Sequence, residues 1–175
     1  MAIRLEDRKL TDREVIVTRV LDAPRSTIFH AWTDPVQLTK WWGPHSVINS
    51  ECQMDVRPGG SYRIVMRGPD GTEYPVKGVY REIKAPTQLV MTMDASEHPK
   101  EWHDLVKPNR SDREKNPVGL MLETVTFEEL GSSKTRVTVR TRFETPEIRN
   151  AMLKMGMTDG WAQSLERLAE VIHYH

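Results

Sequence analysis

The sequence predicts an α+β fold in which a long C-terminal helix covers one face of an antiparallel β-sheet. Several segments between residues 14 and 143 alternate apolar and polar side chains, as strands with one covered face do. Residues 157–172 instead carry apolar side chains every three or four positions, which is typical of an amphipathic helix. We expect the whole chain, residues 1–175, to form one domain around one core.

The N-terminal part predicts one strand and two short helices. Residues 1–13 are mostly polar and are expected to form a loose lead-in. Residues 14–21, EVIVTRVL, are rich in β-branched side chains and predict a strand. A helix should follow, with Pro24 near its start. Its apolar residues at helical spacing are Ile28, Ala31 and Trp32. Asp34-Pro35 ends this helix, and the following VQLTKWW predicts a second short one.

Six further strands are expected before the C-terminal helix. They are residues 46–56, the two arms of a hairpin at 60–86, and residues 87–95, 119–130 and 135–144. The hairpin turns at Gly68-Pro69-Asp70-Gly71, and the segment GSSK joins the last two strands. The residues of the last strand that should face inward are Val137, Val139, Thr141 and Phe143.

The C-terminal segment predicts a long helix, with two alternatives for its first part. Thr145-Pro146 has the form of an N-cap followed by proline at the first helical position. The apolar stripe consists of Met157, Trp161, Leu165, Leu168 and Ile172. Gly156 and Gly160 interrupt the segment, so that residues 146–156 form either a separate turn or a kinked first half.

Residues 96–117, SEHPKEWHDLVKPNRSDREKNP, fit neither a strand nor a long helix. The segment is highly charged and contains three prolines, yet it also carries Trp102, Leu105 and Val106. Irregular connections longer than about 12–15 residues are uncommon, and many of them are lids or mobile segments. We interpret this stretch as a polar insertion and a candidate lid.

The charge balance excludes the usual features of a nucleic-acid binder. The chain has 25 basic and 25 acidic side chains and a formal net charge of zero. No segment approaches the roughly 18 consecutive apolar residues of a membrane span, and the N-terminus lacks an apolar signal stretch. Cys52 is the single cysteine, which excludes an intramolecular disulfide. A cytoplasmic protein is therefore expected.

The order of elements and four motifs carry a resemblance to a known family. The motifs are TRVLDAPRSTIFHAWTDPVQLTKWWGP, DVRPGGSYRIVM, DGTEYPVKGVYREIKAPTQLVMT and MGMTDGWAQSLERLAEVI, spread over residues 13–173. The chain resembles the helix-grip fold of the SRPBCC superfamily, which includes START lipid-transfer domains and the birch-pollen allergens. More narrowly, it resembles the family named after the activator of heat-shock protein 90 ATPase. The insertion at 96–117 departs from that pattern, because a short connection is expected there.

This resemblance implies a curved sheet that grips the long helix and leaves a cavity between them. Several of the nine methionines lie on inward faces, and their flexible side chains suit a pocket that adapts to an apolar guest. The alternative is that these residues only pack a core. The side chains expected to line the cavity are Trp32, Trp41, Tyr62, Met66, Met91, Met93, Phe127, Val139, Met157 and Trp161.

Two adjacent tryptophans stand directly before the Gly43-Pro44 that ends the second helix. Neighbouring side chains on a helix point about 100° apart, so the two rings need two different surfaces. We assign Trp42 to the core and Trp41 to the mouth of the cavity.

Polar groups on the inner face would orient a ligand in such a cavity. Arg19 shares the phase of the inward-facing part of its strand, and if it is buried it requires an acidic partner, Glu123 or Asp159. The alternative is a structural ion pair or an arginine at the edge of the sheet. The candidate orienting groups are Arg19, His30, Glu123 and Asp159.

No catalytic residue, metal site or cofactor is predicted. Residues 98–104, HPKEWHD, bring two histidines and two carboxylates together, but without the spacing of metal ligands. Cys52 has no histidine partner nearby in the sequence. The glycine-rich RPGG lacks both the strand–loop–helix context and the lysine of a phosphate loop.

Three functions follow from these observations, and we favour the first. The chain binds a small apolar or aromatic molecule in the cavity. Alternatively, it is an enzyme, such as a cyclase, dehydratase or hydrolase acting on an aromatic or polyketide-like substrate. The groups that would move protons in it are His30, Tyr62, Arg19, Glu123 or Asp159. The third is a protein–protein interaction module that acts on a chaperone or in a stress response. A homodimer is also considered, because the sheet tip and the insertion offer apolar edges.

Overall fold

The computed structural model describes residues 12–173, so most of the expected lead-in at residues 1–13 lies outside the described residues. The elements in chain order are β1 (Glu14–Leu21), α2 (Arg25–Thr33), α3 (Pro35–Leu38), β2 (Ile48–Met54), β3 (Ser61–Arg67), β4 (Glu73–Lys84), β5 (Gln88–Met93), α4 (Lys100–Val106), β6 (Met121–Glu129), β7 (Thr135–Arg142), α5 (Pro146–Lys154) and α6 (Met157–His173). The predicted order of a strand, two short helices, six strands and a C-terminal helix is confirmed.

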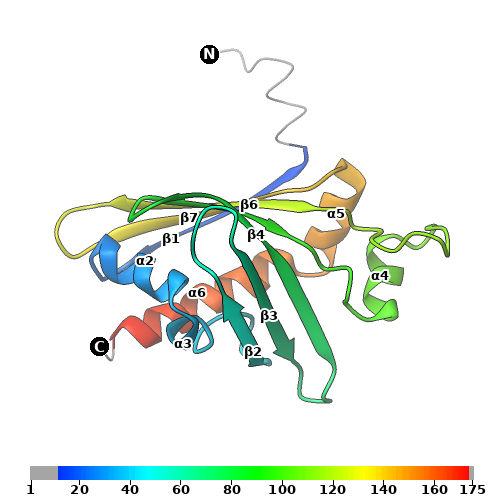
Figure 1. Ribbon diagram of the computed structural model, residues 1–175, viewed down its shortest axis with the longest axis horizontal. Coiled ribbons are helices and arrows are strands. Elements are labelled where there is room, and N and C mark those ends of the chain that lie inside the picture. Colours follow the sequence, from blue (N-terminus) through cyan, green and yellow to red (C-terminus); the bar gives the residue numbers. More distant parts are fainter. Residues whose placement is uncertain (1–11, 174–175) are drawn as a thin grey trace, which may run out of the picture.

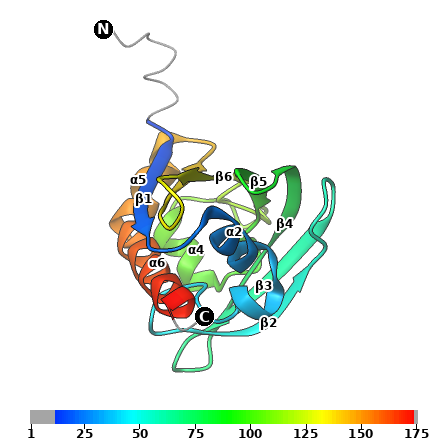
Figure 2. The same ribbon diagram turned by 90° about the vertical axis from the view of Figure 1, so that its left-hand side faces the viewer.

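The strands form one antiparallel sheet of seven, in the order β1-β7-β6-β5-β4-β3-β2. Consecutive strands from β2 to β7 are neighbours, and β1 pairs with β7 at the edge of the sheet. Figure 1 shows α6 running along one face of the sheet, with α2 towards one of its ends and α5 at the other. In the end-on view of Figure 2 the strands form an arch, and α2 and α6 lie on its concave side. The α+β helix-grip fold is therefore confirmed.

The concave face is set by the alternation of side chains along β6 and β7. On β7, Val137, Val139 and Thr141 are buried, which confirms the inward phase that the sequence predicts. On β6 every second residue is likewise buried. The register places Val125 opposite Val139 and Glu123 opposite Thr141. Because the period of a strand is two, the phase that buries these valines also carries the Glu123 carboxyl group into the interior.

The core lies between this face and the two helices α2 and α6. Ile28 and Trp32 of α2 and Leu165 and Leu168 of α6 are at most 1% exposed. Burial of each aliphatic side chain of this size contributes about 1.5–3 kcal/mol. Among the described residues, no helix combines the length and the apolar character that crossing a membrane requires.

The C-terminal segment consists of two helices, so residues 146–156 are separate from the long helix, as in the first alternative, but they form a helix rather than a turn. Thr145 caps α5 by accepting a hydrogen bond from the Ile148 backbone N–H, and Pro146 occupies its first turn, as predicted. Gly156 has a φ of +93°, which glycine adopts readily, and it separates α5 from α6.

The insertion is more regular than the sequence predicts. Residues 100–106 form helix α4, with His103 and Val106 buried. The expectation of irregular chain was wrong here, because two of the prolines lie just before and just after this helix, where proline is tolerated. The segment that precedes α4 continues along β4 through the paired backbone groups of Lys77 and Asp94.

Candidate functional site

Glu123 of β6 is the most unusual side chain of the concave face. It is completely buried, and neither of its carboxyl oxygens has a hydrogen-bond partner among the described residues. Burial raises the pKa of this carboxyl to about 8, because a charged carboxylate is strongly disfavoured away from water. At neutral pH the group is therefore mostly protonated, with one O–H that can donate.

Thr141 of β7 is a second unpaired polar group beside Glu123. The two residues face each other directly across the β6–β7 ladder. Thr141 is 1% exposed, and its hydroxyl oxygen also lacks a hydrogen-bond partner among the described residues. Unpaired buried polar groups are rare and costly, so a neighbouring pair of them marks this point of the sheet.

Both side chains line a pocket of about 190 Å³ between the sheet and α6, which we call the Glu123 pocket. Its remaining walls come from the loop after α3, from the insertion and from α5. Its lining residues are Trp42, Gly43, Pro44, Met66, Val76, Met93, Ala95, His98, Trp102, Met121, Glu123, Thr141, Met152, Met157, Gly160, Trp161 and Ser164.

The walls of the Glu123 pocket consist largely of flexible methionine and aromatic tryptophan side chains. Five of the nine methionines line it, and thioether side chains adapt to the shape of a guest. The rings of Trp42 and Trp161 meet edge to face with centroids 5.4 Å apart. Apart from Glu123, the only ionisable lining residue is His98.

Two residues of the insertion, His98 and Trp102, contribute to the walls of the pocket. A second, outer hollow of about 590 Å³ shares four lining residues with the Glu123 pocket: Pro44, Met66, His98 and Trp102. These four side chains therefore stand between the two hollows. The rings of His98 and Trp102 pack against each other in this wall, with their centroids 4.5 Å apart.

His98 is held as a neutral ring. Its Nδ1 lies 3.0 Å from the carbonyl oxygen of Pro75, and since a carbonyl only accepts, Nδ1 carries the hydrogen. Burial lowers the pKa of His98 to about 4, so the ring is uncharged at neutral pH and Nε2 bears a lone pair.

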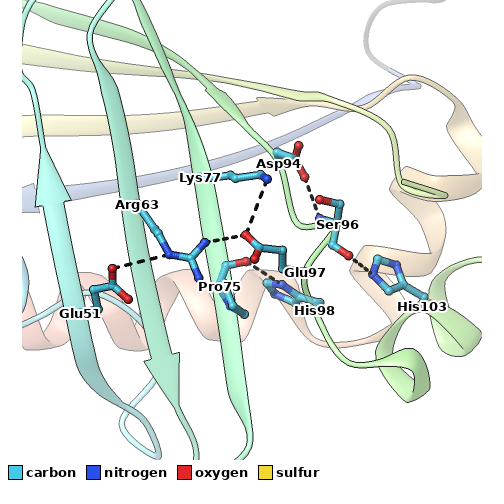
Figure 3. A network of polar contacts seen from close by, with 9 residues as sticks. All are labelled: Glu51, Arg63, Pro75, Lys77, Asp94, Ser96, Glu97, His98 and His103. Carbon is cyan, nitrogen blue, oxygen red and sulfur yellow. Dashed lines mark hydrogen bonds and ion pairs between the residues drawn. The ribbon is translucent and has the colours of Figure 1, made fainter. Parts of the chain in front are cut away.

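A network of polar contacts fastens the insertion to the sheet (Figure 3). The carboxylate of Glu97 accepts a hydrogen bond from Arg63 of β3 and lies 3.7 Å from the ammonium of Lys77 of β4. The Asp94 side chain accepts from the Ser96 backbone N–H, and His103 contacts the Ser96 carbonyl oxygen. The Arg63 hydrogen bond holds the pKa of Glu97 below its usual value.

The Trp42 wall is held in place by Arg167 of α6. Its guanidinium donates to the backbone carbonyl oxygens of the loop that follows α3, at distances of 3.0–3.4 Å. The acceptors are the carbonyls of Lys40, Trp42, Gly43, Pro44 and Val47. Within this loop Gly43 has a φ of +90°, and a Cβ there would come within 2.8 Å of both Val47 and Met66. Glycine is therefore required at this turn.

The structure distributes the ten residues expected to line a cavity over several places. Those that line the Glu123 pocket are Met66, Met93, Met157 and Trp161. Those that pack in the core outside its lining are Trp32, Trp41, Met91, Phe127 and Val139. Tyr62 donates its hydroxyl to the Thr92 carbonyl oxygen, and burial first, then the nearby Glu123, raise the pKa of Tyr62 well above its usual value.

Of the two adjacent tryptophans, Trp42 lies in the core as assigned, whereas the assignment of Trp41 to the mouth of the cavity was wrong. Trp41 is fully buried, its Nε1 donates to the Ala31 carbonyl oxygen at 3.0 Å, and its ring packs 4.4 Å from that of Trp32. Trp42 is 4% exposed, packs in the same core and also lines the Glu123 pocket. Both residues follow the last turn of α3, where helical spacing no longer predicts direction.

Three of the four candidate orienting groups lie outside the pocket. Arg19 belongs to β1, the strand at the edge of the sheet. It lines a separate hollow between β1 and α6, together with Glu166 and Glu170. The side chain of His30 is 65% exposed and lies 3.7 Å from Asp34. Asp159 is exposed in the first turn of α6, where a carboxylate is favourable to the helix. Only Glu123 is inside.

Several lining residues of the Glu123 pocket were not predicted from the sequence. Thr141 was predicted to face inward but was not considered as a site residue, although its position opposite Glu123 follows from the phase of the hairpin. Trp42, His98 and Trp102 come from loops and the insertion, where no period indicates direction. Ser164 and Met152 belong to helices whose rotation about their axes the sequence leaves open.

Cys52 and the histidines of the insertion were the other residues considered for chemistry. Among residues 12–173 no cluster of three or more histidine, cysteine or carboxylate side chains could hold a metal ion. Burial raises the pKa of the Cys52 thiol to about 11, so the reactive thiolate is disfavoured. A larger hollow of about 940 Å³ lies along β3 and β4, and its lining includes exposed charged side chains such as Asp55, Lys77 and Arg81.

The arch of strands around α6, with a pocket between them, defines the chain as a helix-grip protein. The description "Activator of Hsp90 ATPase homolog 1-like protein" matches residues 22–173, and the chain belongs to this family. No match to the chain is found among curated protein sequences.

Several solved structures share the fold. A protein from Nitrosomonas europaea is 27% identical with a TM-score of 0.75, the match covering 93% of this chain and 96% of that one. A protein from Arthrobacter aurescens is 25% identical with a TM-score of 0.77, covering 95% and 89% of the two chains. A protein from Mycobacterium smegmatis is 22% identical, with a TM-score of 0.73 and coverage of 94% of each chain. The last of these likenesses concerns the fold alone.

Proposed function

We propose that the protein binds a small, mostly apolar molecule in the Glu123 pocket. The observation that carries this proposal is the buried, unpaired Glu123 carboxyl group inside a pocket lined by methionine and tryptophan. Apolar walls with a few placed polar groups are the usual make-up of small-molecule sites. A purely structural role would leave the unpaired groups without a purpose, because a leucine at position 123 would fill the same space at lower cost.

The size of the pocket limits the ligand. A cavity of about 150 Å³ accommodates one benzene ring, whereas drug-sized ligands occupy about 300–1,000 Å³. At about 190 Å³, the Glu123 pocket fits a molecule of one ring with a short substituent.

The insertion is the proposed lid of this site. Its His98 and Trp102 lie in the wall between the pocket and the outer hollow, and its Glu97 is tied to the sheet by ion pairs. Release of these surface ion pairs costs little, since exposed pairs contribute only about 0–1 kcal/mol. Ion pairs of this strength allow the insertion to open and to close again over the pocket.

The binding function is tested by filling the pocket. Gly160 is a lining residue of α6, and a Cβ at this position meets no atom within 4 Å. Gly160→Leu should therefore occupy pocket volume while helix propensity improves by up to about 1 kcal/mol. The matched control is Thr158→Leu, which adds a similar side chain at an exposed position of the same helix.

The readout is tryptophan fluorescence, because three of the five tryptophans line the pocket. Titration with one-ring compounds should change the emission of the wild type and of Thr158→Leu, with at least a tenfold weaker response in Gly160→Leu. Equal binding by all three proteins would place the ligand elsewhere and contradict the proposal.

A proton-transfer enzyme is the second candidate function. The observation in its favour is that Glu123, with a pKa of about 8, and His98, with a pKa of about 4, line the same pocket. Groups whose environments push their pKa values apart can serve as acid and base. In D₂O such a pair would exchange the methyl hydrogens of acetophenone for deuterium through its enol. Exchange above the buffer rate that Glu123→Gln abolishes would support this candidate, and exchange at the buffer rate would remove it.

A further inference from the structure

We propose that the Glu123 pocket selects an uncharged one-ring molecule bearing a carbonyl or hydroxyl oxygen, which Glu123 and Thr141 bind together by hydrogen bonds. This inference rests on the proposed binding function and adds the chemical class of the ligand. It depends on which hydrogen-bonding capacities the two side chains leave unused, and on the charges around them.

The geometry of the β6–β7 ladder brings the two groups to one point. Directly opposed residues of an antiparallel pair have Cβ atoms about 4.5–5.5 Å apart, on the same face of the sheet. Glu123 and Thr141 are such a pair, and both line the pocket. The unpaired atoms are both carboxyl oxygens of Glu123 and the hydroxyl oxygen of Thr141.

The capacities of this pair match an oxygen of the ligand. A protonated carboxyl donates one hydrogen bond and accepts others, and a threonine hydroxyl does the same. A ligand carbonyl can accept from both donors, and a ligand hydroxyl can accept from one residue and donate to the other. A hydrocarbon of the same size would leave three buried polar atoms unpaired.

The surroundings disfavour charged ligands. No lysine or arginine side chain is among the lining residues, so that an anion would face Glu123 without a cation to balance it. His98 does not supply that charge, because it is neutral at physiological pH. A protonated amine could pair with an ionised Glu123, but both charges would lose their hydration in an apolar pocket, and this cost often exceeds the attraction between them.

The experiment compares four one-ring probes of similar size: ethylbenzene, acetophenone, benzylamine and benzoate. Their dissociation constants are measured by ligand-observed NMR at pH 6.5 with the wild type, Thr141→Val, Glu123→Leu and the filled variant Gly160→Leu. Thr141→Val keeps the shape of the side chain and removes the hydroxyl, and Glu123→Leu removes the carboxyl. Circular dichroism and thermal unfolding establish that each variant is folded before binding is compared.

The expected result is that acetophenone binds the wild type about tenfold more tightly than ethylbenzene, with benzoate and benzylamine weakest. One additional hydrogen bond of about 1–1.5 kcal/mol corresponds to that ratio. The preference for acetophenone over ethylbenzene should fall in Thr141→Val and disappear in Glu123→Leu, while ethylbenzene binding remains. In the wild type the affinity for acetophenone should also fall as the pH rises above about 8, because an ionised Glu123 no longer donates.

Each other outcome has a definite meaning. Equal affinity for ethylbenzene and acetophenone, or benzylamine as the tightest probe, would overturn the inference and leave the binding function intact. If no probe binds the wild type more tightly than it binds the filled variant Gly160→Leu, the binding function itself fails, and the inference fails with it.

Discussion

At the scale of single residues, the protonation of Glu123 affects both ligand binding and the stability of the fold. The phase of β6 places this carboxyl in an apolar interior, where it stays protonated up to a pKa of about 8. The unfolded chain ionises the same group near its ordinary pKa of about 4.3. Because the folded state holds on to the proton longer than the unfolded state does, the group destabilises the fold as the pH rises.

Glu123→Gln should remove this pH dependence. Between about pH 4.5 and pH 8 the native state binds one more proton at this site than the unfolded state, so the free energy of unfolding of the wild type falls with pH. The slope is at most about 1.4 kcal/mol per pH unit. Above pH 8 both states are ionised and the contribution becomes constant.

Urea unfolding at pH 5, 6.5 and 8 measures this difference. The wild type should lose stability relative to Glu123→Gln over this interval, so that the variant becomes the more stable protein at pH 8. Parallel curves for the two proteins would mean that Glu123 is solvated or paired in solution, contrary to the structure.

At the scale of elements, α6 and the insertion position the walls of the pocket. Arg167 of α6 donates hydrogen bonds to several carbonyl groups of the loop that carries Trp42, and burial lowers the pKa of this guanidinium. A guanidinium suits this role because its fork of five N–H groups can serve several acceptors at once.

Arg167→Ala should destabilise the fold by about 1–3 kcal/mol and loosen the Trp42 wall, because it leaves several partly buried carbonyl groups without their donor. Arg167→Lys should recover only part of this loss, since an ammonium cannot span the same acceptors. Urea unfolding and the tryptophan emission maximum measure both effects. The control Arg81→Ala, at an exposed position, should change neither quantity. A fully stable Arg167→Ala would show that the loop is held by other contacts.

Glu97→Gln should speed the exchange of ligand through the proposed lid. Removing the charge weakens the contacts with Arg63 and Lys77, and exposed pairs of this kind correspond to rate changes of up to about fivefold. Stopped-flow fluorescence should show faster association and faster dissociation with a smaller change in affinity. The control Lys100→Gln breaks an ion pair within α4 and should leave both rates unchanged. Unchanged rates in Glu97→Gln would argue that the insertion does not open.

At the scale of the whole molecule, the sheet and its cover could be predicted from the sequence, whereas most of the pocket could not. The alternation along residues 135–142 determined which side chains face inward, and the stripe at 157–172 determined the covering helix. Glu123 followed from the phase of its strand. Trp42 did not, because the direction of a side chain in a loop depends on tertiary contacts such as those of Arg167. Trp102 did not either, because the short helix α4 that carries it was not predicted.

The dependence of loop side chains on tertiary contacts also explains the wrong assignment of Trp41. Two large side chains before a Gly-Pro stop indicate two surfaces, but only the packing of α2 against the loop decides which ring faces which surface. The hydrogen bond from Trp41 to the Ala31 carbonyl oxygen holds the Trp41 ring against α2. Trp42 is thereby turned towards α6 and the pocket.

The most direct test of the account is methyl NMR of the methionines during titration with acetophenone. Five described methionines line the Glu123 pocket, namely Met66, Met93, Met121, Met152 and Met157, and three do not, namely Met54, Met91 and Met155. We expect saturable shifts of the signals from the first group, with the second group almost unchanged. Unchanged signals throughout, or shifts confined to the second group, would contradict the claim that this pocket is the binding site.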